Sequence, residues 1–156
     1  MSSKILFVCT GNTCRSSMAE ALARKILSIK QSVPDIIVAS AGVAAWPGGP
    51  ASPQAVEALW EYRIDLSSHR AKMVNWQEVD GADLILTMTA SHRQILISRF
   101  PSAAGKIFTL GSYSGEEGDI VDPFGQTVAV YRKCAASLWE LLETALDKFC
   151  RQLEKE

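Results

Sequence analysis

The stretch Cys9-Thr10-Gly11-Asn12-Thr13-Cys14-Arg15-Ser16 follows directly on the apolar run Ile5-Leu6-Phe7-Val8. A strand that enters a glycine-containing loop and then a helix aims several backbone N–H groups, and the positive end of the helix dipole, at one point. Arg15 adds a planar guanidinium whose shape suits phosphate oxygens. The pattern predicts that residues 10–16 bind phosphate above a thiol.

The thiol is that of Cys9, which lies at the base of the predicted loop. The electric field of the loop stabilises a thiolate, so Cys9 is expected to act as a nucleophile at neutral pH. The alternative is a turn whose cysteines merely pack. Because Cys, Gly, Asn, Arg and Ser fall together at a strand-to-helix junction, the functional interpretation is favoured.

Four short β-rich segments alternate with segments of helical periodicity, at residues 5–9, 36–41, 83–88 and 106–110. This alternation is typical of a parallel sheet covered by helices. We therefore expect an α/β fold, with three α/β/α layers around a four-stranded parallel sheet. Ligands of such sheets bind at the carboxyl ends of the strands, where the Cys9 loop and the loops after residues 41 and 110 are expected to meet.

Helices are predicted over residues 17–30, 52–62, 90–99 and from about 127 onward. In the first, Ser17 and Glu20 have the spacing of a capping box. Its apolar residues recur at helical steps and predict one buried stripe, formed by Met18, Leu22, Ile26 and Ile29. A long segment that contains several glycines, residues 111–124, is expected to be a loop.

Length and composition exclude several classes. With 156 residues, 47% of them hydrophobic, the chain is expected to form a single domain, 1–156. A net charge of −1 without long basic runs argues against a nucleic-acid partner. No apolar run suits a signal peptide or a membrane span, and no residues have metal-ligand spacing. We expect a cytoplasmic monomer that needs no metal or cofactor and binds no membrane.

With these features the chain resembles the low-molecular-weight protein phosphatases. Their signature is Cys-x5-Arg-Ser near the N-terminus and a general acid in an Asp-Pro loop, here Asp122-Pro123-Phe124. The resemblance covers nearly the whole chain and implies a phosphotyrosine-phosphatase-I-like fold. It also implies that Cys9 attacks phosphorus, that Arg15 and the loop amides hold the oxygens, and that Asp122 protonates the leaving group and then activates water. Phosphorylated proteins would be the substrates, phosphocysteine the intermediate and inorganic phosphate a product.

The resemblance further implies a hydrogen-bonded network that shapes the loop, formed by Asn12, Ser16, Ser40 and His69. An asparagine tolerates the left-handed backbone that a tight cradle requires. Ser16 either bonds to the thiolate or starts the helix. The other histidine, His92, falls in a polar helical segment and is expected to be solvated.

Three residues bear on substrate choice. Thr13 stands where tyrosine-directed members of the family carry a bulky aliphatic residue and the arginine-directed branch carries threonine. Phosphoarginine is therefore the favoured substrate, with Phe124 as an aromatic wall of the pocket. Trp46 lies where tyrosine-directed members place an aromatic residue, so a tyrosine phosphatase is the alternative.

Two other classes of protein with a related fold are disfavoured by the sequence. Arsenate reductases need two further cysteines in the middle of the chain, and none lies between Cys14 and Cys134. Phosphocarriers of related fold typically lack the loop arginine and the Asp-Pro acid. Finally, Cys14 is five residues from Cys9 and is expected to trap the oxidised Cys9 as a reversible disulfide.

Overall fold

A parallel four-stranded sheet forms the centre of the molecule, as predicted. The computed structural model describes residues 2–30 and 34–155. Its strands are β1 (Ser3–Cys9), β2 (Ile36–Gly42), β3 (Leu84–Thr87) and β4 (Ile107–Thr109). They lie in the order β2-β1-β3-β4, and every neighbouring pair is parallel. The site-bearing strand β1 is thus central, and its last residue, Cys9, is in register with Gly42 of β2.

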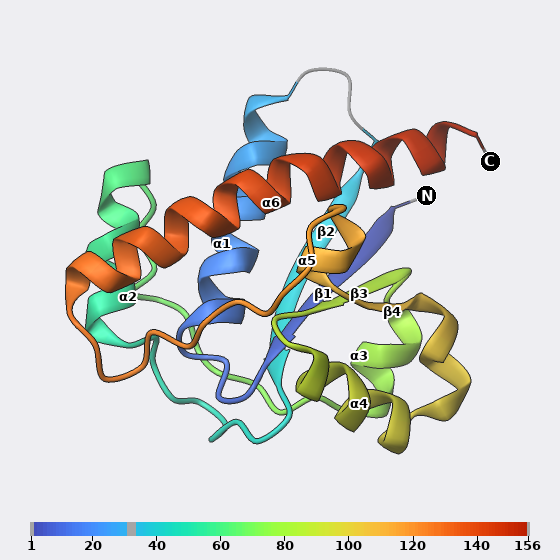
Figure 1. The fold of residues 1–156 in the computed structure, drawn as a ribbon, viewed down its shortest axis with the longest axis horizontal. Coiled ribbons are helices and arrows are strands. Elements are labelled where there is room, and N and C mark those ends of the chain that lie inside the picture. The colour runs from blue at the N-terminus through green and yellow to red at the C-terminus, as the bar shows by residue number, and fades with distance from the viewer. Residues whose placement is uncertain (1, 31–33, 156) are drawn as a thin grey trace.

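Helices cover both faces of this sheet (Figure 1), in agreement with the expected three layers. One layer holds α1 (Arg15–Ile29), α2 (Pro53–Leu59) and the long α6 (Val128–Glu154), and the other holds α3 (Trp76–Gly81) and α4 (Ala90–Arg99). Successive side chains of β1 alternate between the faces, so Ile5 and Phe7 join the first core and Leu6 and Val8 the second. The continuous apolar run therefore reflects a strand buried on both sides.

Three short elements complete the chain: η1 (Trp60–Tyr62), η2 (Pro101–Lys106) and α5 (Leu110–Tyr113). Helix α5 begins at Leu110, which was predicted to end the fourth strand, and continues into the segment that was predicted to be a loop. Thr109 caps it by accepting a hydrogen bond from the Ser112 backbone at 3.1 Å. Helix α3 was not predicted either. It is capped by Asn75, whose side chain accepts from the Glu78 backbone at 2.9 Å.

The start and end of α1 differ from the prediction. The helix begins at Arg15, with Cys14 as its N-cap, so the proposed capping box is wrong. Ser17 instead donates to the Cys14 carbonyl oxygen at 2.9 Å, and Glu20 reaches across to β2. Ile29 is 62% exposed and lies outside the buried stripe, because the helix by then has passed the edge of the core.

Candidate active site

The loop after β1 is anchored by the strand beside it. The backbone N–H groups of Val43 and Ala44 donate to the carbonyl oxygens of Cys9 and Thr10, each at 2.9 Å. Gly42 allows this close approach, since a Cβ atom there would lie 2.4 Å from the Thr10 oxygen. The Cys9 side chain is buried, 3% exposed, at the carboxyl end of β1.

Asn12 organises the interior of the loop. Its φ of 60° is the left-handed conformation expected for this position. Its backbone N–H points at the Cys9 Sγ atom, 3.3 Å away, and its side-chain Nδ2 donates to Ser16 Oγ at 2.8 Å and Ser40 Oγ at 2.9 Å. Its Oδ1 accepts from the Lys72 backbone N–H at 2.9 Å. All the hydrogen-bonding groups of the amide are therefore engaged.

Ser16 does not start α1, which begins at Arg15 with Cys14 as its N-cap, but its side chain contacts Cys9. It lies in the first turn of α1, and its Oγ atom is 2.9 Å from Cys9 Sγ. Because Asn12 already donates to this oxygen, the hydroxyl proton is directed either to the sulfur or to the Ala41 carbonyl oxygen 3.5 Å away, and the contact with the sulfur is the shorter one. A hydrogen bond of that direction stabilises a thiolate.

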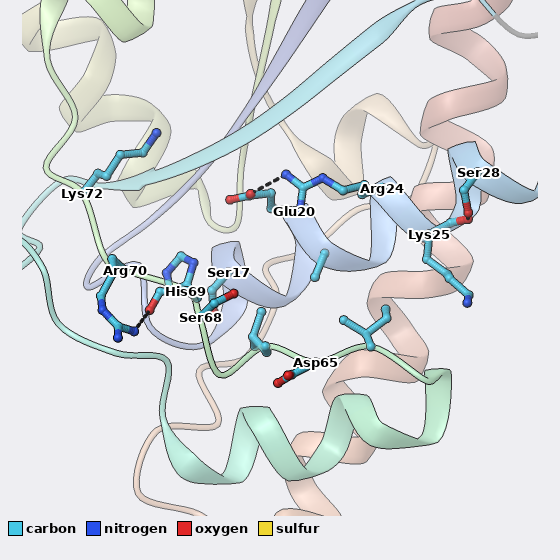
Figure 2. Close-up of a pocket in the computed structure, with 13 residues that line it drawn as sticks. Ser17, Glu20, Arg24, Lys25, Ser28, Asp65, Ser68, His69, Arg70 and Lys72 are labelled. Carbon is cyan, nitrogen blue, oxygen red and sulfur yellow. Dashed lines mark hydrogen bonds and ion pairs between the residues drawn. The ribbon is translucent and has the colours of Figure 1, made fainter.

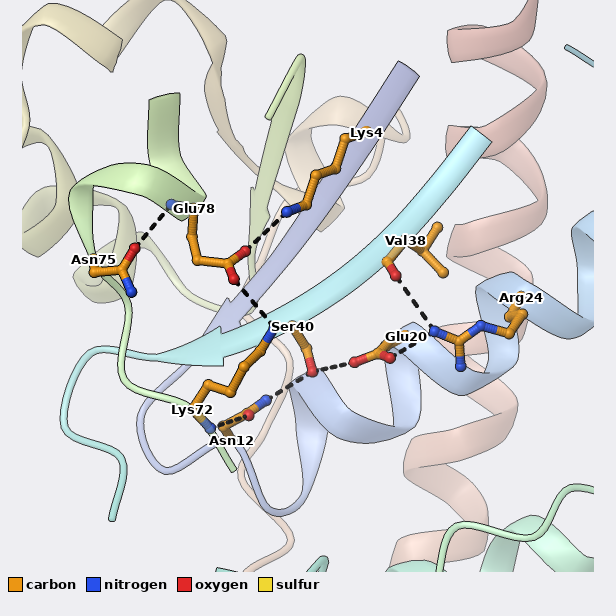
Figure 3. A network of polar contacts seen from close by, with 9 residues as sticks. All are labelled: Lys4, Asn12, Glu20, Arg24, Val38, Ser40, Lys72, Asn75 and Glu78. Atoms are coloured by element: carbon orange, nitrogen blue, oxygen red, sulfur yellow. Dashed lines mark hydrogen bonds and ion pairs between the residues drawn. The ribbon is translucent and has the colours of Figure 1, made fainter. Parts of the chain in front are cut away.

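The network continues outward from Asn12 to the surface (Figure 3). Ser40 donates to the Glu20 carboxylate, which also binds Arg24 at 2.7 Å. On the other side of the asparagine, the Lys72 side chain contacts Glu78 at 3.3 Å. The loop is thus joined to α1, β2 and α3.

His69 contacts the backbone of the phosphate loop at Asn12. Its Nε2 atom donates to the Asn12 carbonyl oxygen at 2.7 Å. Figure 2 shows the ring on the wall of a cavity of about 620 Å³ that separates α1 from the segment 64–72. Charged side chains surround this cavity, but Arg24 is turned to Glu20 and Arg70 to the carbonyl oxygen of His69.

Arg15 and Asp122 meet at the other side of the loop. The Arg15 side chain is buried, and one guanidinium nitrogen donates to the Ile120 carbonyl oxygen at 2.9 Å. Another lies 3.5 Å from Asp122 Oδ2. Half of the Asp122 side chain remains exposed, so the carboxylate has access to a bound substrate as well as to Arg15.

The residues expected to select the substrate are spread around the loop. Thr13 is half-buried, and its carbonyl oxygen accepts from the Ser52 backbone at 3.0 Å. Trp46 and Phe124 are 85% and 70% exposed. Both aromatic side chains are therefore free to contact a large substrate.

Cys14 is turned toward α6. Its Sγ atom lies 3.2 Å from the Tyr131 hydroxyl and 3.5 Å from Ser52 Oγ. Burial, followed by the hydrogen bond to Cys14, raises the pKa of Tyr131 to about 12, so this phenol stays neutral. Tyr131 was not among the predicted site residues, although its place in the first turns of the last helix could have indicated a contact with the loop.

The prediction that His92 is solvated is wrong, because the residue is buried. Its Nε2 atom lies 2.8 Å from Thr10 Oγ1. Burial and then the positive charge of Arg15 lower its pKa to about 4, while Asp119 and Asp122 act in the opposite direction. The ring is therefore neutral at pH 7.

Residues 2–30 and 34–155 contain no group of three or more His, Cys, Asp or Glu side chains placed to hold a metal ion. Within the same residues, no helix combines the length and the apolar character needed to cross a membrane.

A buried cysteine under a loop that ends in arginine, with an aspartate beside it, is typical of cysteine-dependent phosphatases. Residues 4–156 match the family described as low molecular weight phosphotyrosine protein phosphatase, and the chain belongs to that family. The resemblance noted from the sequence is thereby confirmed, and the protein is a phosphatase.

Individual relatives extend this result. The protein-arginine-phosphatase of Bacillus subtilis is 44% identical over 97% of each chain. YwlE arginine phosphatase, solved as a Cys-to-Ser mutant with a phosphorylated active site serine, is 43% identical over 98% of this chain and 97% of its own, with a TM-score of 0.88. A low molecular weight protein tyrosine phosphatase from T. tengcongensis is 46% identical over 94% of this chain and 99% of its own, with a TM-score of 0.87.

Proposed function

We propose that this phosphatase hydrolyses phosphoarginine in proteins through a phosphocysteine on Cys9. The observation that carries the proposal is the set of donors around one sulfur. Cys9 Sγ has the Asn12 N–H at 3.3 Å and the Ser16 hydroxyl at 2.9 Å, and Arg15 closes the same loop. A buried sulfur with two donors is stabilised as a thiolate, the form that attacks phosphorus.

In the first step the thiolate attacks phosphorus opposite the leaving group. The S–P bond forms while the bond from phosphorus to the substrate's guanidine nitrogen breaks, and Asp122 gives its proton to that nitrogen. Arg15 and the N–H groups of residues 10–16 hold the three remaining oxygens. Splitting the displacement at a covalent intermediate replaces one difficult step by two easier ones.

In the second step Asp122, now ionised, takes a proton from a water molecule that attacks phosphorus. The P–S bond breaks, which releases inorganic phosphate and restores the thiolate. Half of the Asp122 side chain is exposed, so its carboxyl group is accessible for both proton transfers. The relative that carries phosphate on a serine in place of its cysteine supports a covalent intermediate.

Substrate choice is inferred from Thr13 and from the relatives. A half-buried threonine hydroxyl can accept a hydrogen bond from a guanidinium N–H, whereas a phenol ring leaves it unpaired. The Bacillus relative named protein-arginine-phosphatase supports this preference. Phosphotyrosine is the second candidate, because the exposed Trp46 offers a ring for stacking and another relative is named a tyrosine phosphatase.

The test compares kcat/KM for two versions of one peptide, with phosphoarginine and with phosphotyrosine. The phosphoarginine peptide is expected to be the better substrate, and Thr13→Ile is expected to shift the ratio toward phosphotyrosine by at least about tenfold. Thr144→Ile, at an exposed position of α6, is the matched control and should leave the ratio unchanged. An unaltered ratio in Thr13→Ile would remove the role of Thr13, and a wild-type preference for phosphotyrosine would overturn the substrate.

We further propose that the enzyme acts as a cytoplasmic monomer without nucleic-acid or membrane partners. The net charge of −1 gives no general attraction to polyanions, which supports this view. Sedimentation at several protein concentrations checks the monomer: a mass that rises with concentration contradicts it.

A further inference from the structure

Thr10, the first residue after Cys9, is hydrogen-bonded to the segments that follow β2 and β3, the two strands beside β1. Its carbonyl oxygen accepts from the Ala44 backbone, just after β2, at 2.9 Å. Its hydroxyl oxygen lies 2.8 Å from Nε2 of His92, in the first turn of α4 after β3. The start of the phosphate loop is therefore fixed by a backbone contact on one side and a side-chain contact on the other.

The His92 ring is locked in this place. The residue is 4% exposed, and its backbone N–H is bound by the N-cap hydroxyl of Thr89 at 3.1 Å. Among residues 2–30 and 34–155, the buried Nδ1 atom has no hydrogen-bond partner. An orphaned buried N–H costs more than an unused lone pair, so the ring proton belongs on Nε2, where Thr10 Oγ1 accepts it.

The same turn of α4 also holds the loop that carries the general acid. The Ala90 backbone N–H donates to the Asp119 carboxylate at 2.9 Å. One residue later, Ile120 donates to the Met88 carbonyl oxygen at 2.9 Å and accepts from Arg15 at 2.9 Å. The contact between His92 and Thr10 thus joins the phosphate loop to the element that positions Asp122.

We infer that His92 is a positioning residue for the proposed phosphatase reaction, which acts by donating from Nε2 to Thr10 and so fixing the phosphate loop relative to the acid loop. The inference rests on the proposed function only for its effect on turnover. The charged groups facing the ring are Arg15, Asp119 and Asp122, and the neutral ring adds no second cation beside Arg15.

Four variants test the contact: His92→Leu, His92→Gln, Thr10→Val, and the double variant of His92→Leu with Thr10→Val. Glutamine carries an N–H donor at the same number of bonds from Cα as His Nε2, so it should restore the contact. Ser91→Ala, exposed in the same turn, is the matched control. Each variant is measured for kcat/KM, for equilibrium binding of inorganic phosphate, and for thermal unfolding.

We expect His92→Leu and Thr10→Val each to weaken phosphate binding and kcat/KM by about three- to tenfold, the effect of one hydrogen bond. The double variant should lose no more phosphate affinity and kcat/KM than the more impaired of the two single variants. His92→Gln should stay within about twofold of the wild type in both quantities. Additive losses, or a glutamine variant as impaired as the leucine variant at equal thermal stability, would overturn the inference.

Phosphate binding separates this inference from the proposed function. If the wild type turned over neither phosphopeptide, the proposed function would fail. The phosphate affinities of the variants would still test the positioning role: non-additive losses in the double variant support it, and additive losses overturn it.

Discussion

At the scale of single residues, the loop is held in shape by a network of hydrogen bonds centred on Asn12. Asn12 Nδ2 supplies the hydrogen bonds that Ser16 and Ser40 accept, and the Ser16 hydroxyl can then donate to Cys9 at 2.9 Å or, over a longer distance of 3.5 Å, to the Ala41 carbonyl oxygen. The presence of asparagine at this position agrees with the sequence argument, since asparagine, like aspartate and glycine, adopts φ near 60° more readily than most residues. The partner Lys72 could not be predicted, because it comes from a distant segment that only the folded chain brings to the loop.

The second cysteine of the loop gives a prediction at this scale. Peroxide oxidises Cys9 to a sulfenic acid, and the Cys14 thiol is expected to attack it, forming the S–S bond and releasing water. Mass spectrometry of the oxidised protein should find the Cys9–Cys14 bridge, and thiol treatment should restore activity. In Cys14→Ser the bridge cannot form, so Cys9 should proceed to sulfinic acid and lose activity irreversibly. Sulfinic acid on Cys9 in the wild type, with Cys14 still reduced, would refute this.

At the scale of elements, three strand ends meet around one loop. Strand β1 delivers Cys9, β2 delivers the backbone donors Val43 and Ala44, and β3 leads into α4 with His92. The position of the site at the carboxyl end of the sheet follows from the strand pattern alone. The buried environment of His92 could not be predicted in this way. The first turn of its helix is polar, which indicates a solvent-exposed position unless the order of the strands is known.

The contact between β2 and the loop gives the prediction for this scale. Gly42→Ala places a Cβ atom 2.4 Å from the Thr10 carbonyl oxygen, a backbone atom that can move only if the loop moves. We expect the free energy of unfolding to fall by about 1–3 kcal/mol and kcat/KM to fall more than tenfold. Urea unfolding and steady-state kinetics measure both. Gly105→Ala, where a Cβ atom meets nothing within 4 Å, is the control, and equal behaviour of the two variants would contradict the argument.

At the scale of the whole molecule, the sheet and its two helical layers were predictable because residues 5–9 of β1 form an uninterrupted apolar run and the longer helices have clear periodicity. The short helices α3 and α5 were missed, since six and four residues give too few turns for a periodic signal. Both are fixed by side-chain caps instead of by an apolar stripe. The architecture brings residues as distant as Cys9 and Asp122 to one loop, and the central claim depends on that juxtaposition.

The most direct test is to find the phosphoryl group on Cys9. In Asp122→Asn, p-nitrophenyl phosphate should still phosphorylate the cysteine, because its leaving group needs little protonation. Hydrolysis of the intermediate should be slowed by about 10²–10⁴-fold, because the base is lost. Glu117→Gln, an exposed acid of the same loop, is the matched control and should turn over normally.

Rapid denaturing quench and mass spectrometry of the Asp122→Asn enzyme should show one phosphoryl group on the peptide that contains Cys9, and none in the corresponding Cys9→Ala enzyme. A product burst without phosphate on Cys9, or phosphate on a different residue, would contradict the account.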